Sequence, residues 1–349
     1  MNEPKSSRYH RLARRAAFLS LICTIGLLLA MLWARPSLPL TAYVVVLIAL
    51  HELIALPIAY YRGFLLEHRY ELSSEPASAW LRDHLKGVAL GLAFAIPGAH
   101  LVYRLIAWSP DWWWLAAAVA GAGVTALIVR AAPVLLLPLF YRFTPLDRPA
   151  LSARLLALSR RAGVPALGVF EWRLGEKTRR ANAALVGAGA TRRILLSDTL
   201  LAEYSDDEIE VILAHELAHH AHRDIAKGLA LEFCVLLASG FVAAVALNRL
   251  WTIAGLQGPA DPAGLPLVLL AGGGVALAAT PLVNAFSRAN ERRADAFAIR
   301  LTRHNDAFIS AMRRLGVQNL AEESPSRVNV LLFHSHPPVE ERIASARLR

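Results

Sequence analysis

Residues 215–219 read His215-Glu216-Leu217-Ala218-His219. Upstream, Ser205-Asp206-Asp207-Glu208 has the pattern of a capping box at the start of a helix. An apolar helix face follows, so residues 215–219 are predicted to be helical; it consists of Ile209, Val211, Ile212, Leu213 and Leu217. Two histidines four residues apart project from the same face of a helix. There they can hold one zinc ion, and Glu216 can reach a water molecule bound beside it.

The chain is too apolar for an ordinary soluble domain. Of its 349 residues 56% are hydrophobic, and the mean hydropathy is +0.41. Six stretches are long enough to cross a hydrocarbon core of about 30 Å, and they lie near 17–34, 39–60, 87–107, 112–141, 228–248 and 264–286. The fourth is overlong and contains Arg130 and Pro133, so we expect it to tilt, kink or finish at the interface. The sequence thus predicts a mainly α, polytopic membrane protein.

Two domains are expected. Residues 1–141 form an N-terminal membrane domain of about four spans, and residues 142–349 form a zinc-binding domain that includes the last two spans. In the second domain, a helix is predicted over 151–162 and a strand over 167–172. Two more strands, 183–186 and 193–196, flank a glycine-rich turn and predict a hairpin.

Basic residues give the orientation. They gather in the N-terminal tail and in the second connection, whereas 108–111 and 251–263 contain no Lys or Arg. By the positive-inside rule, both termini and the residues 215–219 face the cytoplasm. The formal net charge of +10 therefore serves to orient the protein against anionic lipid, and nucleic acid is not expected as a partner.

Two histidines do not complete a catalytic zinc site, which requires three protein ligands and an open position. The downstream candidates are Glu291, Asp295, His304, His334 and His336. Residues 287–301 are predicted to be a helix that continues from the sixth span, on which Glu291 and Asp295 share a face. Two spans separate this helix from residues 215–219, so both lie on the same side of the membrane. The alternative is that Glu291 is an exposed acid paired with a neighbouring arginine, and spacing alone leaves the choice open.

The chain resembles the CAAX prenyl protease 1 family of integral-membrane zinc metallopeptidases. The matching residues are 60–70, Trp80, Asp83, 138–140, 144–146, 182–183, 195–200, 215–219, Ser287, Arg288, Glu291, Ala294, Asp295, 336–338 and Arg342. The resemblance implies a helical barrel around a water-filled chamber, closed by a cytoplasmic zincin-type domain with a small β-hairpin or sheet. The family is described with seven spans where we predict six, and the long 112–141 region or the zinc helix can account for the difference.

The resemblance also implies roles for the site. One zinc ion (Zn2+) per chain is expected on His215, His219 and Glu291, with Glu216 as the general base. His336 is placed to stabilise the oxyanion, although a histidine before Pro-Pro can also be purely structural.

The other expected site residues act around the metal. Arg342 lies close to the centre by resemblance, and Asp295 is expected to orient a zinc histidine rather than to bind metal. Backbone groups of Asn182 and Ala183 can pair with an extended peptide substrate, or else belong to an ordinary sheet.

The expected function is zinc-dependent endopeptidase activity on peptide or protein substrates, with prenylated or membrane-associated ones left open. The Arg- and Ala-rich composition suits a bacterial inner membrane. Two alternatives are a heat-shock-type quality-control zinc protease and a non-catalytic zinc-binding scaffold. An intramembrane site-2 protease is disfavoured, because 219–224 is too polar for the bilayer centre. His51, Glu52 and His100 lie inside predicted spans, where either a water-filled chamber or hydrogen bonds between helices would explain them.

Overall fold

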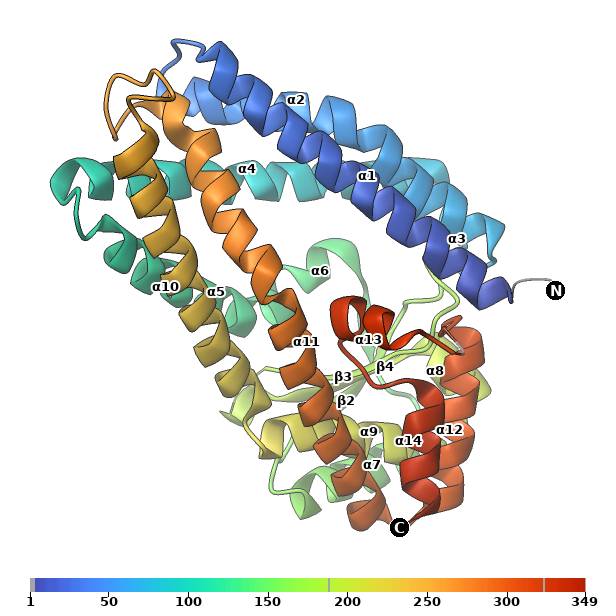
Figure 1. The fold of residues 1–349 in the computed structure, drawn as a ribbon. Helices are drawn as coiled ribbons and strands as arrows, with labels where there is room; N and C mark the ends of the chain where they lie inside the picture. Colours follow the sequence, from blue (N-terminus) through green and yellow to red (C-terminus); the bar gives the residue numbers. More distant parts are fainter. Residues whose placement is uncertain (1–3, 188, 323, 349) are drawn as a thin grey trace.

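The computed structural model describes residues 4–187, 189–322 and 324–348 (Figure 1). Long helices form an open cage, and a smaller mixed part with a sheet lies at one end of it (Figure 1). Within the described ranges, six helices are long and apolar enough to cross a membrane. They are α1 (Lys5–Ala34), α2 (Leu40–Tyr60), α4 (Ala77–Trp108), α5 (Trp113–Leu135), α10 (Asp224–Leu250) and α11 (Leu265–Thr302).

These helices coincide with the six predicted spans but extend beyond several of them. The overlong fourth segment breaks as expected: α5 contains Pro133 and ends at Leu135, and a short α6 (Leu137–Phe140) follows. The second span continues without interruption into a π-helix, η1 (Tyr61–Leu65), and then α3 (Leu66–Arg69). The π-helix was not predicted, whereas the predicted continuation of the sixth span into a helix over 287–301 is confirmed by the 38-residue α11.

The ionisable residues inside the spans form hydrogen bonds between helices. Glu52 of α2 lies 2.8 Å from His84 of α4. His100 lies 2.8 Å from the Thr41 hydroxyl, and His51 lies 3.3 Å from the hydroxyl of Thr24. These pairs give each polar group a partner, which is the second of the two explanations that the sequence left open.

The sheet has four strands in the order β1-β2-β4-β3. They are β1 (Phe143–Pro145), β2 (Gly168–Trp172), β3 (Ala183–Val186) and β4 (Arg193–Ser197). The predicted hairpin is confirmed, because β3 and β4 pair antiparallel with Ala183 opposite Leu196. Strand β1 and the parallel pairing of β2 with β4 were not predicted. β3 is left at the edge of the sheet, where another strand can be added.

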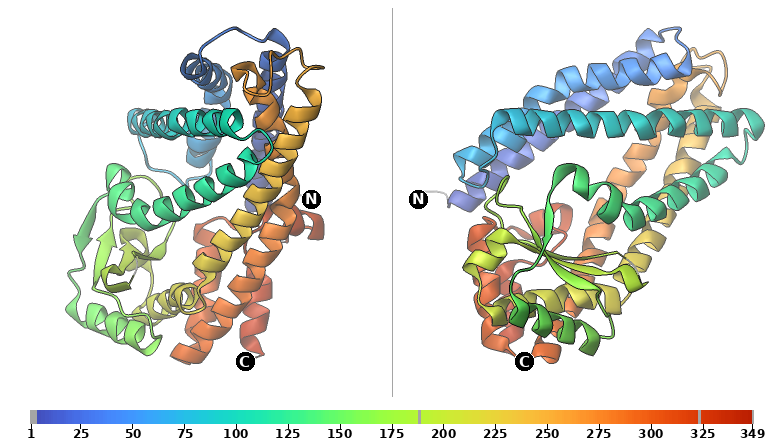
Figure 2. Two further views of the ribbon diagram at one scale, coloured as in Figure 1. Left: turned by 90° about the vertical axis from the view of Figure 1, so that its left-hand side faces the viewer. Right: turned by 180° about the vertical axis from the view of Figure 1, so that it is seen from behind.

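Short helices surround the sheet: α7 (Pro149–Arg161), α8 (Asp198–Glu203), α9 (Asp206–Ala221), α12 (Asn305–Gln318), α13 (Arg327–Phe333) and α14 (Val339–Arg347). α9 packs against β3, α7, α11 and α12, and Figure 2 shows the sheet to one side of it and the α10–α11 pair to the other. Its apolar residues belong to one core with the sheet, and Ile209, Leu213 and Leu217 are completely buried. Burial on several sides holds α9 in one orientation, which fixes the side chains that it presents.

Candidate metal centre

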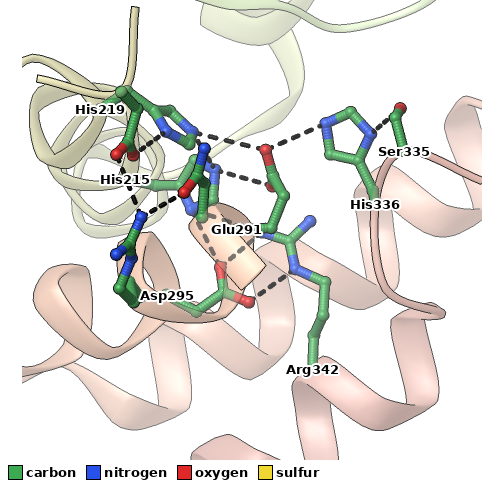
Figure 3. A network of polar contacts seen from close by, with 10 residues as sticks. His215, His219, Glu291, Asp295, Ser335, His336 and Arg342 are labelled. Atoms are coloured by element: carbon green, nitrogen blue, oxygen red, sulfur yellow. Dashed lines mark hydrogen bonds and ion pairs between the residues drawn. The ribbon is translucent and has the colours of Figure 1, made fainter. Parts of the chain in front are cut away.

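Two helices that are distant in the sequence form the centre. α9 begins with the predicted capping box, in which the Ser205 hydroxyl accepts from the amide of Glu208 and the Glu208 carboxylate accepts from the amide of Ser205. His215 and His219 lie in its last two turns and face α11 (Figure 3). α11 runs unbroken from the membrane into the mixed part and brings Glu291 to the same point.

The three side chains converge closely. The Nε2 atoms of His215 and His219 are 3.3 Å apart. Glu291 places one carboxylate oxygen 3.2 Å from His215 Nε2 and the other 3.4 Å from His219 Nε2. One ligand atom from each residue lies within 4.8 Å of the other two. His215 and Glu291 are buried, at 8% and 5% exposure.

The outer nitrogens of both imidazoles are also occupied by carboxylates. His215 Nδ1 lies 2.9 Å from Asp295, and His219 Nδ1 lies 3.1 Å from Asp224. Because each Nδ1–H donates to its carboxylate, each Nε2 presents a lone pair toward the other and toward Glu291. Glu291 Oε2 is buried without a hydrogen-bond partner among the described residues. Two lone pairs and a carboxylate oxygen facing one point fit a cation, and two histidines with one glutamate are a donor set of catalytic zinc.

The pKa shifts agree with this arrangement. Burial disfavours the charged imidazole, yet the carboxylates of Asp295 and Glu291 outweigh it and raise the pKa of His215 to about 9. Burial also raises the pKa of Glu216, even though both histidines oppose that shift.

Asp295 and Arg342 continue the contacts outward from His215. Arg342, on α14, donates to both carboxylate oxygens of Asp295 over 2.9 and 2.6 Å. The structure thus brings together the two residues that we expected around the metal, and it places Asp295 against a histidine as predicted. The pair is almost enclosed, with Arg342 and Asp295 side chains at 12% and 7% exposure.

His336 approaches from the opposite side of Glu291 (Figure 3). Its Nε2 lies 3.4 Å from Glu291 Oε1, and its Nδ1 lies 3.0 Å from the Ser335 hydroxyl. The side chain is 62% exposed, so it is accessible to a ligand that enters the site.

Sequence reasoning missed Asp224. It is the first residue of α10 and lies five positions after His219. The chain turns between them at Arg223, which has φ +56°, so helical periodicity could not connect the two. The sequence did offer one indication of this contact, because Asp224 is an acidic residue close behind the second histidine, at the start of a new helix.

The remaining histidine candidates lie elsewhere. His334 lies 3.3 Å from Glu322, away from the centre. His304 approaches Asp207 and Glu210 in a second group with metal-like donors. Arg154 already binds both of those carboxylates, so a cationic side chain already occupies that group.

His220 has a structural contact. Its Nε2 lies 3.0 Å from the Leu185 carbonyl of β3. It therefore ties the end of α9 to the edge strand beside the metal centre.

A cavity of about 150 Å³ adjoins the metal centre. Its walls include Glu216, Asn182, Ala183, His336 and Arg342. Among the described residues, no hydrogen bond or ion pair joins Glu216 to another side chain, so its carboxylate is available to a ligand in this cavity.

The edge strand offers its backbone to the cavity. The Asn182 carbonyl accepts from the amide of Ser197, so the backbone of Asn182 faces β4. Since peptide groups alternate in direction along a strand, those of Ala183 face the open edge. Both residues that we expected to bind substrate therefore line the site, and Ala183 directs its backbone outward.

Comparisons with known proteins match both parts of the chain. The model of peptidase family M48 matches residues 145–349, and a model described as the CAAX prenyl protease N-terminal region with five membrane helices matches residues 17–142. The chain belongs to peptidase family M48. Within the described part of 17–142, four helices have spanning length and α6 is short.

Individual relatives agree with the M48 assignment. An uncharacterized metalloprotease of Bacillus subtilis, YhfN, is 31% identical over 90% of this chain and 76% of its own length. A CAAX prenyl protease 1 homolog of Dictyostelium discoideum is 27% identical over 82% of this chain and 68% of its own length. The crystal structure of S. mikatae Ste24p has the same fold, with a TM-score of 0.87 at 22% identity over 98% of this chain and 88% of that one.

These findings identify a multi-pass membrane metalloprotease similar to CAAX prenyl protease 1. As a protease it acts on peptides or proteins, its membrane helices contact a lipid bilayer, and membership of M48 implies a metal. The match of the membrane domain to the prenyl protease model favours this type over the heat-shock type.

Proposed function

We propose that this M48 protease is a zinc endopeptidase whose ion is held by His215, His219 and Glu291. The observation that carries the proposal is the 3.3 Å approach of two Nε2 atoms, each with its Nδ1 on a carboxylate, beside an unpartnered oxygen of Glu291. When bound, zinc would supply a Lewis acid that polarises the scissile carbonyl and acidifies the attacking water.

Glu216 would be the general base. It lines the cavity without a hydrogen bond or ion pair to a described residue, and burial raises its pKa. A carboxylate placed in this way can accept the proton of the attacking water and then deliver it to the leaving amine. Its place on the same helix as the two histidines keeps it within reach of that water.

His336 and the edge strand would bind the substrate. His336 lies beside Glu291 and is exposed to the cavity, so its ring N–H can donate to the developing oxyanion. An extended peptide would pair with the backbone of Ala183 and so align its scissile carbonyl with the site. Arg342 would keep Asp295 ionised and directed at His215.

We further propose a cytoplasmic active site with both termini on the same side, as in a bacterial inner membrane. Support comes from the basic N-terminal tail and from the 251–263 connection, which has no Lys or Arg and lies at the opposite end of α10 and α11. A division at about residue 141 would separate the membrane domain from the protease domain, with α10 and α11 belonging to the latter.

The relatives' names make a prenylated peptide the first substrate to examine. We propose that the lipid assists cleavage but that the peptide strand carries recognition, because Asn182 and Ala183, whose backbone can pair with an extended peptide, line the cavity next to the metal. Comparing cleavage of farnesylated and unmodified forms of one peptide tests this. Absolute dependence on the lipid would contradict the proposal.

The decisive experiment is the Glu216→Gln variant of the full chain, assayed for zinc content and for cleavage of a fluorogenic peptide. We expect full zinc occupancy with cleavage reduced to background, because the substitution removes only the base. A non-catalytic scaffold predicts instead that zinc-loaded wild-type protein cleaves nothing.

A further inference from the structure

A larger cavity, of about 630 Å³, lies next to the one at the metal. The two cavities share wall residues, among them Met312, Asn319 and His336. The larger one is bounded by the start of α1, by η1 and by the segments from α12 to α14, which Figure 1 shows close together. A peptide in the metal site therefore continues directly into this space.

Three arginines and one carboxylate line the larger cavity. Arg14 donates to Glu322 over 2.8 Å, and Arg342 is engaged by Asp295. His334 lies 3.3 Å from the same Glu322 carboxylate, which is thus shared by two basic groups. The third arginine, Arg62, forms no hydrogen bond or ion pair with any residue that the structure describes.

Arg62 is presented by an unusual backbone. It is the second residue of η1, the π-helix that follows the second span. π-helical turns are rare and occur frequently at functional sites. Here the turn carries an unpaired guanidinium at the wall of a cavity that adjoins the metal centre.

The direction of the edge strand relates this cavity to the substrate. The residues just before β3, Ala181 and Asn182, line the metal cavity together with Asn319. Gln318, the neighbour of Asn319, donates to the Arg179 carbonyl over 3.0 Å. The larger cavity thus lies at the beginning of β3, and a peptide added antiparallel to β3 would direct its carboxyl-terminal side there.

We propose that Arg62 forms a subsite for a carboxylate on the carboxyl-terminal side of the scissile bond. The subsite rests on the proposed peptidase function and adds a charge preference to it. A planar guanidinium binds carboxylates in a bidentate manner, and Glu322 does not compete because two basic groups hold it. The carboxylate can be the terminus of the peptide or an acidic side chain.

The experiment uses three peptides that share one scissile bond. One ends in a free carboxylate close to that bond, one has a terminal carboxamide, and one has a carboxamide with an internal Glu. Cleavage is measured as kcat/KM, and binding is measured separately with the Glu216→Gln protein. With Arg62 intact, we expect kcat/KM for the better of the two carboxylate peptides to exceed that for the plain carboxamide peptide by about tenfold. The binding affinities should differ by about the same ratio. Arg62→Gln should bring that ratio near one, and Arg62→Lys should keep part of it, since lysine preserves charge but not bidentate geometry.

Arg69→Gln is the matched control, because Arg69 lies on α3, is exposed and does not line this cavity. It should leave the ratio at the wild-type value. The subsite is refuted if wild type cleaves all three peptides equally, if Arg62→Gln lowers all three alike, or if Arg69→Gln has the same effect. Failure of wild type to cleave any peptide would instead refute the peptidase proposal, and the binding ratio would still decide the subsite. Which carboxylate gives the larger ratio distinguishes a chain terminus from an acidic side chain.

Discussion

The two histidines of the metal centre are supported in different surroundings. His215 rests on Asp295, which Arg342 holds with two hydrogen bonds inside the protein. His219 rests on Asp224, whose other oxygen is shared by Lys227 and Arg293 with side chains 41% and 49% exposed. We call these the inner and the outer arm. Interactions of exposed ions are weakened by solvent, so the inner arm should contribute more to the geometry of the site.

The largest expected effect on zinc affinity comes from removing the Glu291 carboxylate, which lies between the two histidines. In Glu291→Gln, the carboxylate that faces both Nε2 atoms becomes an amide, which is a poor zinc ligand. We expect a loss in zinc affinity greater than about 100-fold, the upper end of losses for outer partners, together with loss of cleavage. Glu340→Gln, at an exposed position of α14, is the control. Normal zinc content in Glu291→Gln would exclude it as a ligand.

Breaking the inner arm should have the next largest effect. Asp295→Asn removes the charge that orients His215 and leaves buried Arg342 without its ionic partner. We expect a loss in zinc affinity near the upper end of the 10–100-fold range, measured by competition with a chromophoric chelator. A lower melting temperature should accompany it, since an unpaired buried charge destabilises the folded state.

Breaking the outer arm should cost less. Asp224→Asn keeps the hydrogen bond to His219 but loses the charge. The partners Lys227 and Arg293 are 41% and 49% exposed, so water can solvate them when that charge is lost. The expected loss in zinc affinity is about tenfold, in the same chelator competition. If the two asparagine variants lose zinc affinity equally, the distinction between the arms is wrong.

The smallest expected effect on zinc affinity comes from a substitution at the start of α9, which tests whether the site depends on the stability of the whole helix. Ser205 caps the far end of that helix and touches neither arm. Ser205→Ala should lower the free energy of unfolding by about 1 kcal/mol and leave the zinc affinity unchanged. A melting curve in detergent and the same competition assay measure both quantities. A change in zinc affinity would show that the site depends on the helix start.

Local patterns predicted much of the fold. The capping box, the hairpin and the six long helices each depend on neighbouring residues, so they could be recognised without knowing what lies around them. The parallel pairing of β2 with β4 depends on contacts between distant strands, and no local pattern specifies it.

The same limit applies to the site. Asp295 could be expected because it lies four residues after Glu291 on one helix, whereas Asp224 lies beyond a turn with a positive φ and follows no helical spacing. Arg62 belonged to residues 60–70 of the family resemblance and to the basic second connection, and neither pattern gave it a role of its own. Its lack of a partner becomes visible once α1, η1 and the C-terminal segments surround one cavity.

The contact between His220 and the Leu185 carbonyl limits how far the exposed edge of the sheet can be extended. A long strand from another molecule would have to hydrogen-bond to that carbonyl, which His220 already contacts. This contact therefore opposes the extension of the sheet from one molecule to the next. Only the portion around Ala183 is left open. The enzyme can thus bind a short extended segment of an unfolded chain, while edge-to-edge aggregation through β3 is disfavoured.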